Sequence, residues 1–350
     1  MEQHIIISKC LEKELAIAIS ECEHDRVFIL VDETTADKCW PVISNFRYIK
    51  EDTLIKIKAT DAHKDLKSLS YVWQQLSQGG ATRHSCLINL GGGMVTDLGG
   101  FAASTFKRGI DFINIPTTLL AMVDASVGGK TGINFNGLKN EIGVFNTAHS
   151  VIIDTQFLQT SDIGNLRSGY GEMLKHGLIS NDTLWQQLIS FDLEQPNLSL
   201  LQSMVADSIK VKEQIVKQDP LEHGLRKALN LGHTIGHAFE SLALKRQSPV
   251  LHGYAVAFGL ICELYLSHIK SGFPVNKLRS TVNYIKEYYG MYTFTCDDYE
   301  SLIELMKHDK KNVSGIINFT LLHDVGDIKI NQTATKEEIF EAFDFFREGL

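Results

Sequence analysis

Two histidines, His233 and His237, stand four residues apart in the segment GLRKALNLGHTIGHAFE, residues 224–240. If this segment is one helix, a rotation of 100° per residue places Arg226, Asn230 and both histidines in a stripe about 60° wide. Apolar residues that lie elsewhere around the helix and can be buried are Leu225, Leu229, Ile235 and Phe239. Such a polar stripe on an otherwise apolar helix indicates the wall of a binding site rather than a surface that faces solvent.

The i, i+4 spacing of the two histidines allows a shared metal ion, although no glutamate follows the first one as in the HExxH zinc motif. A further ligand must come from elsewhere, and the candidates are His252 in VLHGYAVAFG and Glu172 in GYGEMLKHGLI. Lys175 lies one turn beyond Glu172, and the two could also form an ordinary surface ion pair. The apolar residues around them favour a buried position. Nitrogen and carboxylate ligands together favour Zn²⁺ or Co²⁺.

A second group of residues is suited to a phosphate-bearing cofactor. In LINLGGGMVTDLGG an apolar run ends in three glycines, residues 91–93, and a helix-like segment follows. A strand, a glycine turn and a helix N-terminus expose backbone N–H groups to an anion, commonly a dinucleotide pyrophosphate. Thr96 stands where the GxGxxG fingerprint has its third glycine or alanine, so a plain tight turn is the alternative.

Two later segments combine lysines with turn residues. The loop around Gly128-Gly129 carries polar side chains suited to a phosphate or a carboxylate, or forms a plain turn. These side chains are Asp124, Lys130, Lys139 and Asn140. In HDKKNVSG, Lys310 and Lys311 stand at a predicted helix end, where compensation of the helix dipole is the alternative role.

The elements that must position these residues differ between the two halves of the chain. In the first half, β-branched segments alternate with helix-like ones, which predicts a parallel α/β sheet. The predicted strands are residues 26–31, 53–59, 86–90, 111–116 and 150–154. In the second half, apolar residues recur every three to four positions, which predicts helices, with a short strand pair near GIINFTLL. We therefore expect a Rossmann-like α/β domain over residues 1–158, a mainly helical domain over 159–350, and an active site in the cleft between them.

Composition narrows the functional class. A chain of 350 residues with 44% hydrophobic and 22% charged residues is typical of a soluble globular protein of two domains. The net charge of −8 argues against nucleic acid as a partner. The sequence predicts neither a signal peptide nor a membrane span. Six cysteines without a CxxC pair favour reduced thiols and a cytoplasmic location.

Taken together, the motifs resemble the 3-dehydroquinate synthase family of the sugar-phosphate cyclase superfamily. The resemblance runs from about residue 26 to residue 330. It rests on GGGMVTD, Arg108-Gly109, PTTLLAMVDASVGGKTG, LKNEIG, GEMLKHG, GLRKALNLGHTIGHA, LHGYAVAFG and HDKK, in the order of the family. It implies a carbon–oxygen lyase that converts 3-deoxy-D-arabino-heptulosonate 7-phosphate to 3-dehydroquinate and phosphate, in the shikimate pathway of aromatic amino-acid biosynthesis. The implied steps are transient oxidation by NAD, phosphate elimination, re-reduction and intramolecular aldol cyclisation.

The resemblance also implies a role for each site residue. It places nine residues around NAD: Asp32, Asp61, Lys64, Gly92, Gly93, Asp97, Thr117, Thr118 and Lys139. It assigns a divalent metal, Zn²⁺ or Co²⁺, to Glu172, His233 and His252. It forms the substrate cradle from Arg108, Asp124, Lys130, Asn140, Lys175, Lys212, Arg226, Asn230, His237 and one of Lys310 or Lys311.

Within this cradle the resemblance assigns the substrate carboxylate to Lys212 and Arg226. The phosphate falls to Asn140, Asn230, His237 and the HDKK lysine, so His237 faces phosphate rather than metal. Arg108 resembles an arginine that reaches the site of a neighbouring subunit in a homodimer. Two residues depart from the family: Asp61 replaces a glutamate near the ribose, and Tyr254 replaces the glutamate of HGEAVA beside a metal ligand.

Three alternatives stay open on the residues alone. One is a related cyclase that acts on sedoheptulose 7-phosphate or glucose 6-phosphate, which lack the carboxylate that Lys212 and Arg226 would bind. Another is a metal- and NAD-dependent polyol dehydrogenase of similar fold, which would produce NADH. The third is a non-enzymatic binding protein, which would be expected to have lost metal ligands.

Overall fold

The computed structural model describes residues 3–22, 24–50, 53–220, 222–307 and 316–348. The chain divides into two compact units, Met1–Asp162 and Ile163–Leu350. The sequence analysis places the domain boundary between residues 158 and 159, four positions before this division.

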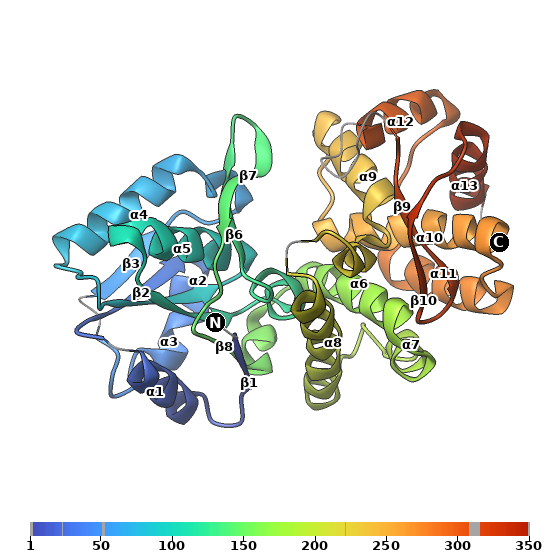
Figure 1. The fold of residues 1–350 in the computed structure, drawn as a ribbon. Coiled ribbons are helices and arrows are strands. Elements are labelled where there is room, and N and C mark those ends of the chain that lie inside the picture. The colour runs from blue at the N-terminus through green and yellow to red at the C-terminus, as the bar shows by residue number, and fades with distance from the viewer. Residues whose placement is uncertain (1–2, 23, 51–52, 221, 308–315, 349–350) are drawn as a thin grey trace. The chain divides into compact units, whose positions relative to one another are not determined.

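The first unit is built on a six-stranded parallel sheet in the order β1-β8-β5-β4-β2-β3 (Figure 1). Its strands are β1 (His4–Ile7), β2 (Val27–Asp32), β3 (Leu54–Ile57), β4 (Cys86–Gly91), β5 (Asp111–Pro116) and β8 (Ser150–Ile153). Its helices are α1 (Leu11–Glu21), α2 (Glu33–Lys38), α3 (Trp40–Ile43), α4 (Leu66–Gln78) and α5 (Gly93–Thr105). The central strand β4 is buried along its whole length, and its one polar side chain, Asn89, donates a hydrogen bond to Asn114 Oδ1 at 2.9 Å. The predicted parallel α/β fold is confirmed.

The order of strands reverses between β2 and β4. From β2, the chain adds β3 on one side and then returns to place β4 on the other. Leu30 pairs with Asn89, and Gly91 pairs with Pro116, so the carboxyl ends of β2, β4 and β5 lie level with one another. Ligands of open parallel sheets bind at such a switch point. The glycine turn after β4 is therefore at the edge where a cofactor is expected.

A hairpin replaces the loop that the sequence analysis assumes between residues 130 and 145. Strands β6 (Lys130–Phe135) and β7 (Leu138–Phe145) pair antiparallel and extend away from the main sheet (Figure 1). The two-residue turn is Asn136-Gly137, and both residues have positive φ, 50° and 78°. Asn-Gly is the preferred pair for this type of hairpin turn, so the dipeptide was an available signal.

The second unit is mainly helical, as predicted. It contains α6 (Ile163–Ser180), α7 (Asp182–Ile189), α8 (Leu198–Gln218), α9 (His233–Lys245), α10 (His252–Ser271), α11 (Val275–Tyr289), α12 (Tyr299–Lys307) and α13 (Lys336–Glu348). A hairpin of β9 (Phe319–Asp324) and β10 (Asp327–Gln332) lies near the predicted strand pair. Helix α10 packs against α6, α9, α11 and α13 as well as β9, which makes it the central element of this unit.

The prediction of one continuous helix over residues 224–240 is wrong. Residues Leu225–Asn230 form a short 3₁₀ helix, η6, and α9 begins only at His233. Gly232, directly before α9, has a left-handed conformation with φ 78°, which ends the first segment and redirects the chain. Arg226 and Asn230 therefore do not continue the helical stripe of His233 and His237.

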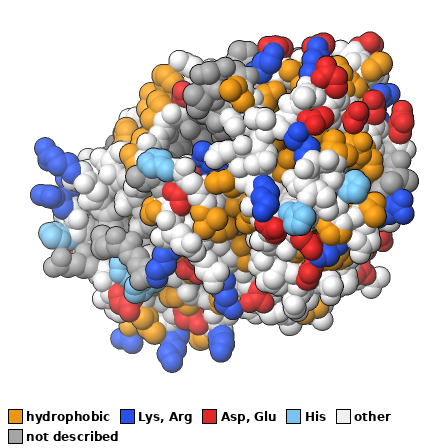
Figure 2. Space-filling view, turned by 45° about the vertical axis from the view of Figure 1, so that its right-hand side comes forward, with side chains coloured by type: hydrophobic (Ala, Val, Ile, Leu, Met, Phe, Trp, Pro, Cys, Tyr) orange, Lys and Arg blue, Asp and Glu red, His pale blue; other side chains and the backbone are white. Residues whose placement is uncertain are grey.

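Surface and composition add three observations. Among the described helices, none combines the length and the apolar character that crossing a bilayer requires. All six cysteines are free. Acidic and basic side chains are interspersed over the face drawn in Figure 2, so neither sign of charge forms a continuous field there.

Candidate active site

Three helices of the second unit bring one acidic and two imidazole side chains to a common point. Glu172 lies on α6, His233 is the first residue of α9, and His252 is the first residue of α10. His252 Nε2 lies 3.1 Å from Glu172 Oε1, and His233 Nε2 lies 3.2 Å from the same oxygen. Glu172 is fully buried. The three residues assigned to a metal by resemblance are thus close neighbours in space.

The second nitrogen of each ring has its own partner. His233 Nδ1 lies 3.1 Å from the carbonyl oxygen of Leu231, and His252 Nδ1 lies 3.3 Å from Glu240 Oε2. A carbonyl oxygen can only accept, so His233 Nδ1 carries the hydrogen, and in the neutral ring Nε2 keeps its lone pair. Partners of this kind orient the histidine ligands of metal sites. The sequence analysis missed Glu240, although it lies one turn beyond His237 on the same helix.

This arrangement fits a divalent cation. A lone pair on His233 Nε2 and an anionic oxygen of Glu172 repel each other at 3.2 Å unless a proton or a cation is shared between them. Two imidazole nitrogens and one carboxylate oxygen are the donor set of catalytic zinc sites, and they also suit Co²⁺.

Charges around Glu172 favour its ionised form. Burial by itself would raise the pKa of this carboxyl, but the Lys175 ammonium and the His233 and His252 rings lower the pKa well below its usual value. Lys175, also buried, donates a hydrogen bond to Glu172 Oε2. Burial would lower the pKa of His252, yet its bonds to Glu172 and Glu240 raise that pKa to about 10. The ionised Glu172 carboxylate therefore favours a positive charge where the two Nε2 atoms meet it.

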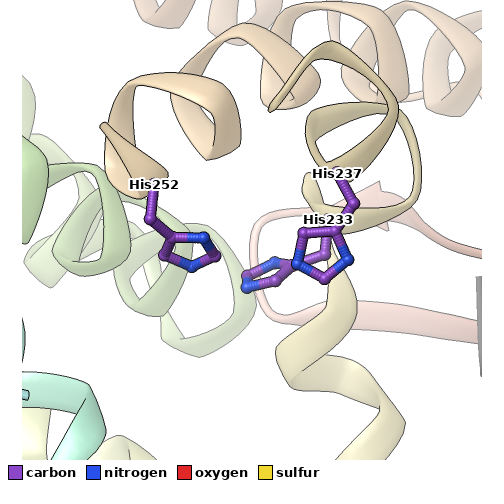
Figure 3. A group of neighbouring side chains, drawn as sticks. All are labelled: His233, His237 and His252. Atoms are coloured by element: carbon purple, nitrogen blue, oxygen red, sulfur yellow. The ribbon is translucent and has the colours of Figure 1, made fainter. Parts of the chain in front are cut away.

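His237 stands beside this group. The three histidine rings point towards one another in Figure 3, two from α9 and one from the start of α10. Their candidate ligand atoms all lie within 4.8 Å of one another. The geometry is compatible with the metal-ligand role that spacing suggests for His237 and with the phosphate-binding role that the family resemblance implies.

Glycines allow two of the ligand-bearing helices to pack unusually closely. A Cβ at Gly253, next to His252, would lie 1.6 Å from the carbonyl oxygen of Ser168 on α6. A Cβ at Gly171, next to Glu172, would lie 2.3 Å from the carbonyl oxygen of Gly253. Because no side chain separates the two backbones, the position of Glu172 relative to His252 is set by direct main-chain contact.

Other predicted substrate residues of this unit are buried near the ends of its helices. Lys212 on α8 and Arg226 in η6 are 6% and 2% exposed. Arg226 Nη1 donates to the Pro220 carbonyl oxygen at 2.5 Å, and Asn230 Nδ2 donates to Glu222 Oε1 at 3.2 Å. Lys310 and Lys311 lie outside the described residues.

In the first unit, the glycine turn lies between β4 and α5. The Thr117 N–H donates to the Gly91 carbonyl oxygen at 3.0 Å, which joins the turn to the end of β5. Gly92 precedes α5 and has no side chain that could cap it. A Cβ at Gly92 would lie 3.1 Å from Thr118 Cγ2, and one at Gly93 would lie 3.2 Å from Ala125 Cβ. The turn therefore keeps a helix N-terminus open to close approach by an anion, as a bound pyrophosphate requires.

Asp32 ends β2, the strand next to β4, and accepts a hydrogen bond from the Thr35 N–H at 2.7 Å. The structure thus uses this predicted NAD residue as the cap of α2.

Arg108 and Asp124, two predicted substrate residues of the first unit, lie in short helical turns. Arg108 is in η3 (Phe106–Arg108) and is exposed, and Asp124 is in the π-helical turn η4 (Ala121–Ala125).

A second polar cluster joins the first unit's hairpin to α5. The buried Lys64 donates hydrogen bonds to Asp97 Oδ2 and, at 2.5 Å, to Asn140 Oδ1. Asn134, which the sequence analysis missed, links the same elements: its N–H donates to the Lys64 carbonyl oxygen at 2.7 Å and its Oδ1 accepts from the Asn140 N–H at 2.9 Å. Lys139 lies 3.9 Å from Asp61 in an exposed pair.

A cavity of about 290 Å³ adjoins this cluster, with Asp97, Lys130 and Asn140 among its lining residues. This cavity in the first unit is therefore lined by Asp97, which the resemblance assigns to NAD, and by Lys130 and Asn140, which it assigns to the substrate. The lining combines the Lys130 side chain and the Asn140 amide with the carboxyl groups of Asp97 and Glu141, so its charges are mixed.

Comparison with known proteins connects the chain to one family. The family model described as 3-dehydroquinate synthase N-terminal matches residues 54–168, and the model described as 3-dehydroquinate synthase C-terminal matches residues 169–312. The chain is 55% identical over 348 residues to 3-dehydroquinate synthase of Parabacteroides distasonis, and the match covers 99% of each chain.

Solved structures show the same fold. A 2-epi-5-epi-valiolone synthase from Streptomyces hygroscopicus with NAD⁺ and Zn²⁺ bound superposes with a TM-score of 0.85 at 23% identity, covering 99% of this chain and 97% of that one. A 2-deoxy-scyllo-inosose synthase in complex with carbaglucose-6-phosphate, NAD⁺ and Co²⁺ gives 0.83 at 23% identity, covering 99% and 96%. At this identity the two likenesses establish the fold and nothing more specific.

Proposed function

The chain belongs to the 3-dehydroquinate synthase family, and we propose that it performs this family's reaction with the residues described above. The reaction converts 3-deoxy-D-arabino-heptulosonate 7-phosphate to 3-dehydroquinate and phosphate. The observation that carries the proposal is the convergence of His233 Nε2 and His252 Nε2 on Glu172 Oε1, at 3.2 and 3.1 Å. A sequence that had lost the activity would have no reason to keep this donor set buried and oriented.

Glu172, His233 and His252 would hold Zn²⁺ or Co²⁺, and the glycine turn after β4 would hold the pyrophosphate of NAD. When bound, NAD supplies reversible hydride transfer, and the cation makes a substrate hydroxyl more acidic as a Lewis acid. The carbonyl oxygen of Leu231 and the carboxylate of Glu240 keep both rings in the orientation that presents Nε2. Asp97 and Lys64 pair beside the first turns of α5 and fix the wall of the cofactor site.

Buried cations in the second unit suit a substrate with two anionic ends. Lys212 and Arg226 would bind the carboxylate, because both are buried and can give charge-assisted hydrogen bonds. Asn230, His237 and one HDKK lysine would bind the phosphate. Lys175, held against Glu172, would place an ammonium next to the reacting carbons. Such a site binds and orients a substrate that carries both a carboxylate and a phosphate. Its lysine and arginine side chains balance these charges, and Lys175 balances the charge of Glu172.

A comparison of substrates tests the proposal against related cyclases and dehydrogenases of this fold. The protein, supplied with NAD⁺ and Zn²⁺ or Co²⁺, is incubated separately with 3-deoxy-D-arabino-heptulosonate 7-phosphate, sedoheptulose 7-phosphate and glucose 6-phosphate. We expect phosphate and 3-dehydroquinate from the first and no turnover of the other two. Turnover of sedoheptulose 7-phosphate, or steady NADH formation from a polyol, would overturn the substrate assignment while leaving the fold unchanged.

We further propose a homodimer in which Arg108 reaches the partner's site. Two observations support it. Lys107 and Arg108 are exposed and hold positive φ values of 49° and 72°, a strained conformation that non-glycine residues keep where function requires it. Every residue of β7 is exposed, including Leu138 and Phe145, which are 54% and 58% exposed and apolar. Surface of this kind favours contact with a second chain.

Mixing two variants tests this arrangement. R108A and E172Q should each lose activity, and each should sediment as a dimer. If Arg108 acts in the neighbouring site, hybrids of the two variants contain one complete site and regain part of the activity. If Arg108 acts in its own site, or the protein is a monomer, mixing restores nothing.

The six free cysteines support a cytoplasmic location, which fractionation of the native cells would check.

A further inference from the structure

The first turn of α9 is held by a buried carboxylate from another helix. Glu263 lies on α10 and is 0% exposed. Its Oε2 accepts a hydrogen bond from the Gly232 N–H at 2.6 Å, and its Oε1 accepts one from the Ile235 N–H at 3.0 Å. His233 lies between these two donors in the chain. One side chain thus binds the backbone on both sides of a predicted metal ligand.

This carboxylate takes the place of an ordinary helix cap. Helices usually begin at a residue whose own side chain accepts from the first N–H groups, and Ser, Thr, Asp and Asn are preferred there. Gly232 stands at this position in α9 and makes no such bond. A negative charge at the N-terminus of a helix is also favoured by the helix dipole. Glu263, which lies 31 positions after Gly232 in the chain, supplies both the hydrogen-bond acceptors and the negative charge at this helix N-terminus.

Close packing explains why no local side chain can do the same. Gly232 has φ 78°, and a Cβ there would lie 2.8 Å from Leu260 Cδ2. A Cβ at Gly259 on α10 would lie 2.0 Å from the Gly232 carbonyl oxygen, and one at Gly236 would lie 2.7 Å from the Ala255 carbonyl oxygen. The start of α9 is thus pressed backbone to backbone against α10. A side chain on α10 is close enough to reach the N–H groups, and Glu263 does so.

We propose that Glu263 is a positioning residue of the metal site, which fixes the first turn of α9 so that His233 Nε2 points at Glu172. Its hydrogen bonds to Gly232 and Ile235 are made with main-chain N–H groups. The inference rests on the proposed function only in that Glu172, His233 and His252 bind a divalent cation. None of the residue assignments made above gives Glu263 a role.

The test compares metal binding by metal-free E263Q and wild-type protein. The glutamine amide can accept one of the two N–H groups, but its own NH₂ then faces the other, so the first turn must shift. We expect Co²⁺ to bind about 10- to 100-fold more weakly, the usual effect of losing an outer partner of a ligand. The visible absorption spectrum of bound Co²⁺ should change as well, because it reports ligand geometry.

A variant on the same helix provides the matched control. Ser267 is also 0% exposed, lies one turn from Glu263, and donates to the Glu263 carbonyl oxygen at 2.6 Å. S267A should lower the melting temperature and leave the Co²⁺ affinity and spectrum unchanged. If E263Q behaves in the same way, with wild-type affinity and spectrum, Glu263 serves stability alone and the proposal is overturned. If wild-type protein binds no Co²⁺ at all, the proposed function itself fails.

A measurement on the unaltered protein covers the case in which E263Q does not fold. If cation binding requires an ordered first turn of α9, a bound cation must in turn stabilise that first turn. The reason is that coupling between cation binding and opening of the turn is reciprocal. Zn²⁺ should therefore slow amide hydrogen exchange at Gly232 and Ile235 more than at the C-terminal end of α9. Equal effects at both ends, or none at these two amides, would contradict the positioning role.

Discussion

Glu172 and His252 are 80 positions apart in the chain, yet Glu172 Oε1 lies 3.1 Å from His252 Nε2. Close contact between α6 and α10, at Gly171 and Gly253, brings them together. Glu172 also pairs with buried Lys175, so its carboxylate faces an ammonium on one side and the imidazoles on the other. We therefore propose two separable tasks for this one carboxylate, which are to bind a cation and to balance the charge of Lys175.

Replacing Glu172 by glutamine should remove both cation binding and the charge balance of Lys175. In E172Q the buried Lys175 loses its counter-charge, and breaking a buried pair costs about 3–5 kcal/mol of stability. Cation affinity should fall by more than the roughly 100-fold that loss of an outer partner costs. Isothermal titration with Zn²⁺ and thermal unfolding of the metal-free protein measure the two effects.

The double variant E172Q/K175M separates them. It removes the buried ammonium together with the carboxylate, so stability should largely return while cation binding stays lost. Recovery of Zn²⁺ binding in the double variant would show that Glu172 acts through charge balance and is not a ligand.

Much of this structure could be predicted from the residues, because the information was local. Short segments with β-branched residues predicted five of the six strands of the parallel sheet, all except β1, and three-to-four-residue periodicity predicted helices such as α8 and α10. The break before α9 was missed because the left-handed conformation of Gly232 follows from its contact with α10, which helical periodicity does not reveal. The hairpin of β6 and β7 was missed although Asn136-Gly137 signalled it.

For the candidate site, most of the residues that could be named lie within recognisable motifs. Glu240, Asn134 and Glu263 were missed because each acts through partners far away in the chain. Glu263, for example, binds amides 28 and 31 positions away. The apolar residues around Glu263 indicate that it is buried, but they do not identify the amides that it binds.

The glycine turn predicts a specific effect of a single methyl group. G92A should weaken NAD⁺ binding about tenfold, or about 1.4 kcal/mol, because the added Cβ fills the space through which the pyrophosphate approaches α5. Isothermal titration with NAD⁺ provides the measurement.

Crowding against Thr118 is a second way in which this methyl group could act, since Cβ would lie 3.1 Å from Thr118 Cγ2. G92A/T118S removes that methyl group and keeps the hydroxyl. Affinity should remain low in the double variant. Full recovery would assign the loss to the Thr118 contact rather than to a blocked anion site.

Lys212 should contribute to substrate binding through charge. K212A should raise the KM for 3-deoxy-D-arabino-heptulosonate 7-phosphate at least about tenfold, as loss of one partner of a buried charge pair does. Lys210 lies on the same helix, pairs with Asp207 at 2.9 Å, and has a side chain that is 65% exposed. K210A should leave steady-state kinetics unchanged. Equal KM values for the two variants would remove Lys212 from the site.

A carboxylate at the start of α13 predicts a pH dependence of stability. Glu338 accepts from Lys270 on α10 at 2.9 Å and from the Thr335 N–H at 2.7 Å. The Lys270 bond and the Thr335 N–H lower the pKa of Glu338, although burial opposes them. A carboxyl with a lowered pKa stabilises the fold above its unfolded pKa, about 4.3, and this stabilisation is lost as pH falls through the folded value.

E338Q should therefore be less stable than the wild type by about 1 kcal/mol at pH 7, and the difference should shrink below about pH 4. Melting temperatures at several pH values give the comparison, and E337Q on the same exposed turn serves as the control for loss of one charge. A difference that stays constant down to pH 3 would argue that the Glu338 carboxylate charge is not responsible.

The most direct test of the account is reconstitution of the chelator-stripped protein. Phosphate release from 3-deoxy-D-arabino-heptulosonate 7-phosphate is followed with neither, either or both of NAD⁺ and Zn²⁺, while NADH absorbance is recorded. The account predicts release only when both are present, with no accumulation of NADH. Release without added metal or NAD⁺ by fully stripped protein, or NADH that accumulates with turnover, would contradict it.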